Sequence, residues 1–151
     1  MRRNDRLINE EEAYQILEKG EYGILSMVTR ESAPYSIPLN YCVLDGTLYF
    51  HCAMDGEKII HLENNPRVSF CVVGHTIPMP SKFATLYESC IIRGNSSEAF
   101  GEEKQKGLEG LIRKYSPDFL EEGLSYIDKL RKKTRVFAIT IDSISGKARR
   151  S

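Results

Sequence analysis

The sequence lacks an excess of either charge, and it lacks the hallmarks of membrane and secreted proteins. Lys plus Arg is 21 and Asp plus Glu is 21, so no net charge draws the chain to nucleic acid or anionic lipid. No window approaches the roughly 18 consecutive apolar residues of a membrane-spanning helix, and residues 1–12 contain no apolar signal-peptide core. We therefore expect a cytoplasmic protein without a nucleic-acid or membrane partner.

The sequence also lacks the short motifs of several enzyme classes. GxSxG, P-loop and GxGxxG patterns are absent. The four cysteines form no CxxC pair and lie in apolar runs, which favours buried, reduced thiols. The histidines at 51, 61 and 75 have no metal-ligand spacing. We expect no metal site, with His61 on a helix surface and His75 in a loop.

The length of 151 residues suits a single domain, residues 1–151. Asn9 and Glu12 form a capping-box pattern, Ser116 precedes Pro117 as a second helix start, and residues 75–82 contain two prolines typical of a loop. The strands follow one another without repeated crossover helices, which predicts a mainly β (β+α) fold: a six-stranded antiparallel barrel with peripheral helices. Periodicity predicts helices over 9–20, 56–64, 102–115 and 116–132, and strands over 22–29, 35–44, 47–53, 67–74, 83–100 (bent near Gly94) and 134–144.

A two-residue Asp45-Gly46 turn sets the register of the predicted hairpin. If the two strands pair without interruption, alternate side chains lie on opposite faces of the hairpin, one of which would be a core face. The other face has no charged residue, yet it pairs Asn40 with His51. Such a face favours contact with a ligand or a partner subunit, and the alternative, which Pro38 would also fit, is an edge strand that binds nothing. The core face would carry Leu39, Tyr41, Val43, Leu48, Phe50 and Cys52, and the contact face Pro38, Asn40, Cys42, Tyr49, His51 and Ala53.

After Ala53 the chain turns at Asp55-Gly56 and begins a helix. Free amides at a helix N-terminus attract anions, and Lys58 adds a positive charge in the first turn. This arrangement fits a phosphate site, but an exposed lysine on a short helix explains it equally well. His51, on the adjoining strand, could hydrogen-bond a cofactor or donate a proton.

The stretch "PYSIPLNYCVLDGTLYFHCAMDGEKIIHLENNPRVSFCV" resembles the pyridoxamine 5'-phosphate oxidase-like, FMN-binding split β-barrel proteins, and in particular their 5-nitroimidazole-resistance-related branch. The resemblance extends over nearly the full length, and its specificity comes from the order of the motifs. The matching segments are residues 2–6, 34–41, 49–58, 65–70, 85–89 and 146–149.

The resemblance implies a homodimer with FMN at each of two subunit-interface sites. Lys58 would hold the phosphate, and His51 is the candidate for proton transfer or for tuning the flavin. The family often has Ser where this chain has Cys52, and a thiol is the weaker donor. The implied cofactor-binding residues are Pro38, Leu39, Asn40, Tyr41, His51, Cys52, Ala53 and Lys58, with Tyr87 and Ser89 completing the site across the interface.

The activity that the resemblance implies is an FMN-dependent oxidoreductase, which takes electrons from a nicotinamide or similar donor and reduces a small acceptor such as a nitroaromatic. The chain ends "SGKARRS" and lacks the arginine-containing substrate motif of true pyridoxamine-phosphate oxidases, which argues against that oxidase activity. Two alternatives remain: a flavin-binding or sensing protein without its own turnover, and a related split barrel that uses haem or deazaflavin.

Overall fold

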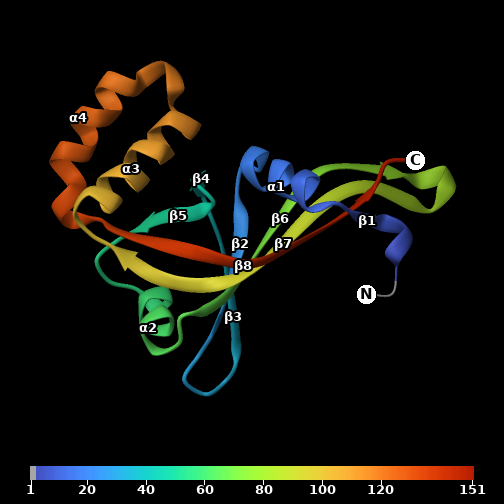
Figure 1. The fold of residues 1–151 in the computed structure, drawn as a ribbon, viewed down its shortest axis with the longest axis horizontal. Coiled ribbons are helices and arrows are strands. Elements are labelled where there is room, and N and C mark those ends of the chain that lie inside the picture. The colour runs from blue at the N-terminus through green and yellow to red at the C-terminus, as the bar shows by residue number, and fades with distance from the viewer. Residues whose placement is uncertain (1–2) are drawn as a thin grey trace.

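The computed structural model describes residues 3–151, so Arg2 of the N-terminal motif lies outside the described part. Long antiparallel strands curl around a core, and helices lie at the periphery (Figure 1). Short 3-10 turns cover Asn4–Arg6, Pro80–Lys82, Pro117–Phe119 and Arg131–Lys133. The main elements are β1 (Leu7–Ile8), α1 (Glu10–Lys19), β2 (Gly23–Val28), β3 (Pro34–Leu39), β4 (Cys42–Leu44), β5 (Thr47–Cys52), α2 (Glu57–Asn64), β6 (Arg67–Met79), β7 (Ala84–Ala99), α3 (Gly101–Tyr115), α4 (Leu120–Leu130) and β8 (Arg135–Arg149).

The strands form one antiparallel sheet in the order β3-β2-β6-β7-β8-β5-β4, with β1 paired to β8. The two ends of this path, β3 and β4, are separated in the chain by Asn40 and Tyr41 alone, so the sheet must curl back on itself. This confirms the antiparallel split-barrel architecture with peripheral helices, although residues 3–151 form eight strands where six were predicted. The long strands β6, β7 and β8 extend beyond the barrel as an arm, on the right of Figure 1.

The predicted strand over 35–44 is wrong, because it is two strands with different partners. The inner hairpin register is confirmed: Cys42 faces Tyr49, and the next two pairs follow as expected. Pro38 instead pairs with Ile24 of β2, on the edge of the sheet where a proline is tolerated. The predicted Pro38–Ala53, Leu39–Cys52, Asn40–His51 and Tyr41–Phe50 pairs do not form, because the ladder ends at Cys42.

The arm accounts for the other errors in the predicted strands. Residues 75–79, predicted as a loop, continue β6 past a bulge between Val73 and Thr76. Prolines are tolerated there because β2 pairs only with residues 69–71 of β6, which leaves one side of the distal segment unpaired. The predicted bend in β7 is confirmed as a register shift between Arg93 and Gly94. His75 therefore lies in a strand rather than a loop.

The helices follow the sequence closely, with two differences. The capping box of Asn9 and Glu12 is present at the start of α1. The predicted helix over 116–132 begins instead as a 3-10 turn, and Ser116 makes no side-chain cap. His61 is buried rather than on the helix surface, because its ring packs edge-on against Tyr35 and bonds Glu57.

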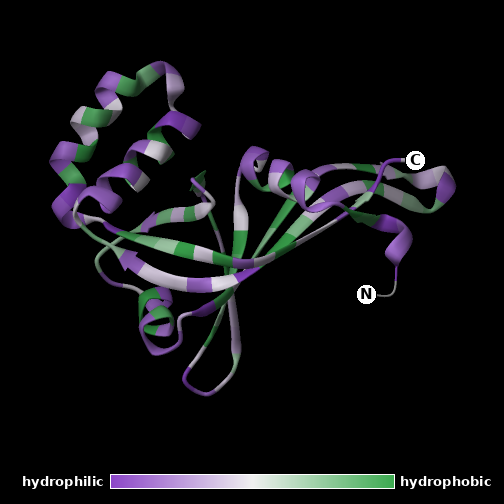
Figure 2. Cartoon of the chain, in the orientation of Figure 1, coloured by the Kyte–Doolittle hydropathy of each residue, from purple (hydrophilic) through white to green (hydrophobic). Residues whose placement is uncertain are grey.

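The hydrophobic core has two parts. The larger fills the barrel, and includes Tyr41, Phe50 and Phe70. The smaller lies between the outer side of β5 and the α3–α4 hairpin, where Cys42 and Tyr49 are buried. Apolar and polar residues alternate along these helices in Figure 2, as expected for helices with one packed face. The predicted contact face is therefore partly covered by the chain's own helices, and His51 and Ala53 remain exposed.

Residues of α3 hold the chain where β3 passes into β4. The Tyr115 hydroxyl accepts a hydrogen bond from the Tyr41 N–H (3.1 Å) and shares its proton between the carbonyl oxygens of Glu21 (2.5 Å) and Tyr41 (3.1 Å). Lys114 Nζ lies 3.7 Å from the centre of the Tyr41 ring and has no hydrogen-bond partner among residues 3–151. Burial lowers the pKa of Lys114. The Tyr41 hydroxyl donates to the Leu17 carbonyl inside the core.

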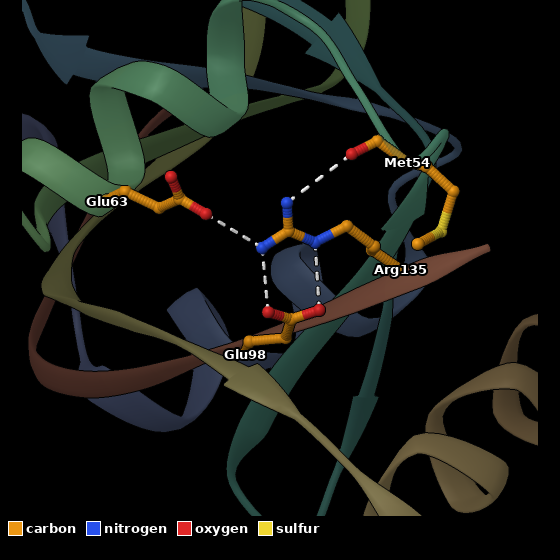
Figure 3. A network of polar contacts seen from close by, with 4 residues as sticks. All are labelled: Met54, Glu63, Glu98 and Arg135. Atoms are coloured by element: carbon orange, nitrogen blue, oxygen red, sulfur yellow. Dashed lines mark hydrogen bonds and ion pairs between the residues drawn. The ribbon is translucent and has the colours of Figure 1, made fainter. Parts of the chain in front are cut away.

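An arginine network fastens the chain between β5 and α2 to the sheet (Figure 3). Arg135, opposite Cys52 in the β5–β8 ladder, makes a bidentate contact with Glu98 at 2.7 and 2.9 Å and bonds Glu63 of α2 at 2.9 Å. Its guanidinium also donates to the Met54 carbonyl at 3.4 Å. The Arg135 guanidinium holds the pKa of Glu98 below its usual range, against the opposing effect of burial.

Replacing Tyr115 by Phe should destabilise the fold by about 1–3 kcal/mol, because the backbone N–H of Tyr41 loses its acceptor in a part-buried site. The free energy of unfolding from urea titration measures this loss. Tyr126→Phe is the matched control, since Tyr126 is 61% exposed. Equal stability of the two variants would contradict the role given to the Tyr115 hydroxyl.

Glu98→Gln should remove part of the acid sensitivity of the fold. A carboxyl whose folded pKa is depressed stabilises the protein above its unfolded pKa, near 4.5, and this contribution is lost as pH falls through the folded pKa. We expect the variant to be less stable than the parent by roughly 1.5–3 kcal/mol at pH 7, with the gap closing below about pH 4. Unfolding titrations across this range test the prediction, and a pH-independent gap would refute it.

Candidate functional site

The outer side of β5 ends in an exposed histidine beside a lysine. Phe50 and Cys52 point into the barrel core. The alternate residues, His51 and Ala53, are exposed on the opposite side. Partial burial, and then the charge of Lys58, lower the pKa of His51. The ring is therefore neutral at pH 7, with one N–H donor and one nitrogen acceptor.

The helix that follows begins without a protein cap. Its N-cap is Gly56, whose φ of 149° favours glycine, and no side chain in the described part of the chain caps the first turn. Helix α1 differs, because Asn9 accepts from the Glu12 amide there at 2.8 Å. Lys58 lies in the first turn of α2 and makes no ion pair or hydrogen bond with any of residues 3–151. Uncapped amides and a lysine together form a site suited to an anion.

Cys52 does not present its thiol to this anion site. Its side chain is 7% exposed and packs in the barrel core. Burial raises the pKa of the Cys52 thiol, although Lys58 and Arg135 oppose the shift, so the thiol stays protonated at neutral pH. Any contact between Cys52 and a ligand in the anion site must therefore come from its backbone.

The segment from Pro38 to Tyr41 has two exposed and two inward-facing residues. Pro38 and Asn40 are exposed, Leu39 is partly buried against the core, and Tyr41 is fully buried. Both backbone groups of Tyr41 already bond the Tyr115 hydroxyl. The side chains available to a ligand are those of Pro38 and Asn40. The buried Tyr41 holds this segment in place through its bonds to Tyr115.

Tyr87 and Ser89 lie far from the anion site within one chain. Val136 of β8 is opposite His51 on one side and Ala99 on the other. Ser89 lies ten residues before Ala99 on β7, a distance of roughly 30 Å along an extended strand. One chain therefore does not bring Tyr87 and Ser89 together with His51 and Lys58.

An uncharged patch on the outer side of the sheet, here called the outer sheet face, was missed by the sequence analysis. It consists of Ile24, Pro38, Cys71, Val73 and Ile91, which follow one another across β3, β2, β6 and β7. Val73 is 57% and Ile91 45% exposed. The alternation of residues 67–73 could have indicated this face, but the partner strands that complete it are distant in sequence. Exposed apolar patches of this kind mark interaction surfaces.

No group of three or more His, Cys, Asp or Glu side chains within residues 3–151 is arranged to hold a metal ion. The four cysteines are free. Over the same part of the chain, none of the helices has the length and apolar character required to cross a bilayer.

Comparison with solved structures shows the same fold in several bacterial proteins. A protein from Bacteroides thetaiotaomicron described as a candidate 5-nitroimidazole antibiotic resistance protein is 24% identical, with a TM-score of 0.80 over 93% of this chain and 85% of its own. A FAD-binding protein from Mesorhizobium loti is 26% identical, with a TM-score of 0.67 over 95% and 97%. A FAD- and heme-binding protein from Mycobacterium smegmatis is 16% identical, with a TM-score of 0.76 over 95% and 72%.

No curated protein matches the sequence. A family model does: the model described as pyridoxamine 5'-phosphate oxidase matches residues 9–148, which include strands β2 to β7, β8 up to its penultimate residue, and the anion site. The chain therefore belongs to the pyridoxamine 5'-phosphate oxidase family.

Proposed function

We propose that the protein is an FMN-dependent oxidoreductase that binds the cofactor at the subunit interfaces of a homodimer. The observation that carries the proposal is the anion site formed by Lys58 and the uncapped start of α2 beside His51. A flavin mononucleotide has a phosphate at one end that such a site would hold. Flavin binding by structural neighbours, which include a flavocytochrome from Azotobacter vinelandii, supports the choice of cofactor.

Two features support a dimer. The outer sheet face is apolar and exposed, so a second copy would bury it favourably. The other is the separation of the implied cofactor residues, since Tyr87 and Ser89 lie on the arm, far from Lys58. A two-fold related partner could bring its own Tyr87 and Ser89 to the first subunit's anion site. Each interface would then combine one anion site with one arm.

In this proposal the exposed side chains contact the cofactor and the buried ones hold the wall in place. Lys58 binds the phosphate, and the first-turn amides of α2 complete its hydrogen bonds. His51 and Ala53 continue the wall, and Pro38 and Asn40 line the ring and ribityl chain. Leu39, Tyr41 and Cys52 contribute through backbone position, and Tyr87 and Ser89 come from the partner subunit.

When bound, FMN supplies the redox chemistry, and the protein supplies binding, orientation and electrostatics. His51 is the residue proposed to tune the flavin or to take part in protonation. Its lowered pKa leaves a neutral ring, which donates one hydrogen bond through its N–H and can take up a proton at its other nitrogen before passing it on. A nicotinamide is the proposed electron donor, and a small aromatic, with nitroaromatics as the leading class, is the proposed acceptor. The resemblance to the nitroimidazole-resistance neighbour motivates that choice.

The absorption spectrum of the purified protein, recorded during titration with FMN, tests the proposal. A bound flavin gives bands that distinguish it from haem and from deazaflavin. Reduction by NADH or NADPH without air, followed by reoxidation with a nitroaromatic, separates an enzyme from a flavin-binding protein without turnover. A protein that ignores added FMN would contradict the proposal.

Lys58→Ala should weaken FMN binding by roughly 1.5–3 kcal/mol and leave riboflavin binding nearly unchanged, because riboflavin has no phosphate. Fluorescence titration of both ligands measures the difference. Lys132→Ala is the matched control, since Lys132 is exposed in the turn after α4. Equal losses of FMN and riboflavin affinity would remove Lys58 from the phosphate site.

A further inference from the structure

A small cavity lies between the α3–α4 hairpin and the sheet, outside the residues that the sequence analysis singled out except for His51. Its volume is about 120 Å³. It is bordered by both helices, by β5 and by the turn that leads into β8, and it opens to solvent where His51 and Tyr126 are exposed. The lining residues are His51, Leu108, Leu111, Ile112, Tyr126, Ile127, Leu130, Arg131 and Thr134.

The wall of this cavity is aliphatic, and its polar groups are few. Leu108, Leu111 and Ile127 are each at most 7% exposed. The Thr134 hydroxyl donates to the Leu130 carbonyl at 3.0 Å and is thereby occupied. Among the lining side chains, those with an unused hydrogen-bond donor within residues 3–151 are therefore Tyr126, His51 and Arg131, since the single Thr134 donor is taken.

Arg131 is held at the edge of the cavity with its charge only partly used. One of its terminal nitrogens donates to the Gly101 carbonyl at 2.7 Å, and no carboxylate among residues 3–151 pairs with it. Its other N–H groups can donate, as can one nitrogen of His51. An arginine and a histidine beside an apolar cavity favour a ligand with an apolar body and an acceptor at one end.

The size of the cavity restricts the ligand further. An apolar cavity of about 150 Å³ in another protein stays dry and binds benzene. We propose that this cavity is a binding site for a single aromatic ring that carries an acceptor substituent, such as a nitro or carboxylate group, which bonds His51 or Arg131.

The location of His51 connects this cavity to the proposed cofactor site. His51 lines the cavity and also lies on β5, two residues before Ala53, in the wall assigned to FMN. The cavity is thus the acceptor site of the proposed oxidoreductase, a conclusion that rests on the proposed function. The binding of a ring in the cavity does not depend on it, and can be tested separately.

The test uses the whole 151-residue chain, as purified and after saturation with FMN, and 4-fluoronitrobenzene as the probe in a fluorine NMR titration. We expect saturable binding, and a weakening of about tenfold or more in Leu130→Phe, which fills the cavity with a larger side chain. Leu124→Phe is the matched control, because Leu124 is on the same helix and packs against the smaller core without lining the cavity. Thermal unfolding verifies that each variant is folded.

A second variant keeps the test decisive if Leu130→Phe fails to fold. His51→Leu, at an exposed position, should weaken 4-fluoronitrobenzene and leave 4-fluorotoluene unchanged, because the second ring has no acceptor. Loss of probe binding in Leu130→Phe with FMN affinity intact supports the cavity site. Unchanged binding in Leu130→Phe and His51→Leu, or no binding by the parent, overturns it. Probe binding in a protein that takes up no flavin would uphold the cavity and refute the proposed function instead.

Discussion

The bonds between Tyr115 and the backbone of Tyr41 fix the point on which the rest of the structure depends. They replace sheet hydrogen bonds where the chain leaves β3 and enters β4, the two ends of the sheet. Because these ends meet, the sheet curls and encloses the larger core. The α3–α4 hairpin packs on its outer side and covers the smaller core. The same contact keeps Pro38 and Asn40 exposed at the edge of the sheet. The Tyr115–Tyr41 bonds therefore support both the curled sheet and the proposed flavin wall. Lys114, stacked on the Tyr41 ring without a hydrogen-bond partner in the described chain, adds to this fixation.

A single subunit carries two separate parts of the proposed site. At one end, Arg135 holds the chain before α2 in place, which sets the direction of the uncapped helix start and Lys58. At the other, the arm carries Tyr87 and Ser89. The outer sheet face contains no charged residue. Pairing it with the same face of a second copy would bring the anion site of one subunit to the arm of the other. Dimerisation and cofactor binding would then be one event, with each stabilising the other by mass action.

Local interactions were predictable from the sequence, and long-range ones were not. The capping box at Asn9 and the register at the Asp45-Gly46 turn depend on neighbours within a few residues, and both were predicted correctly. The break after Leu39 was not, because the hydroxyl that replaces the ladder belongs to a residue 74 positions after Tyr41. His61 was wrongly placed on the helix surface for a similar reason, since Tyr35 of strand β3 covers it. For the candidate site, the Lys58 and His51 half could be proposed from the sequence. The outer sheet face and the ring-sized cavity arise only when distant elements meet.

The most direct test of a cofactor site shared between subunits is FMN binding by a mixed dimer. One subunit would carry Lys58→Glu and the other Ser89→Leu, with a different affinity tag on each so that the heterodimer can be purified. If each site combines Lys58 of one subunit with Ser89 of the other, both substitutions fall in the same site of the heterodimer. The second site then keeps its native Lys58 and Ser89. The account predicts that each variant homodimer binds FMN poorly and that the heterodimer regains half of the parent's FMN content with the parent's affinity. A heterodimer that binds no better than the two homodimers, or a Ser89→Leu homodimer that binds normally, would contradict it.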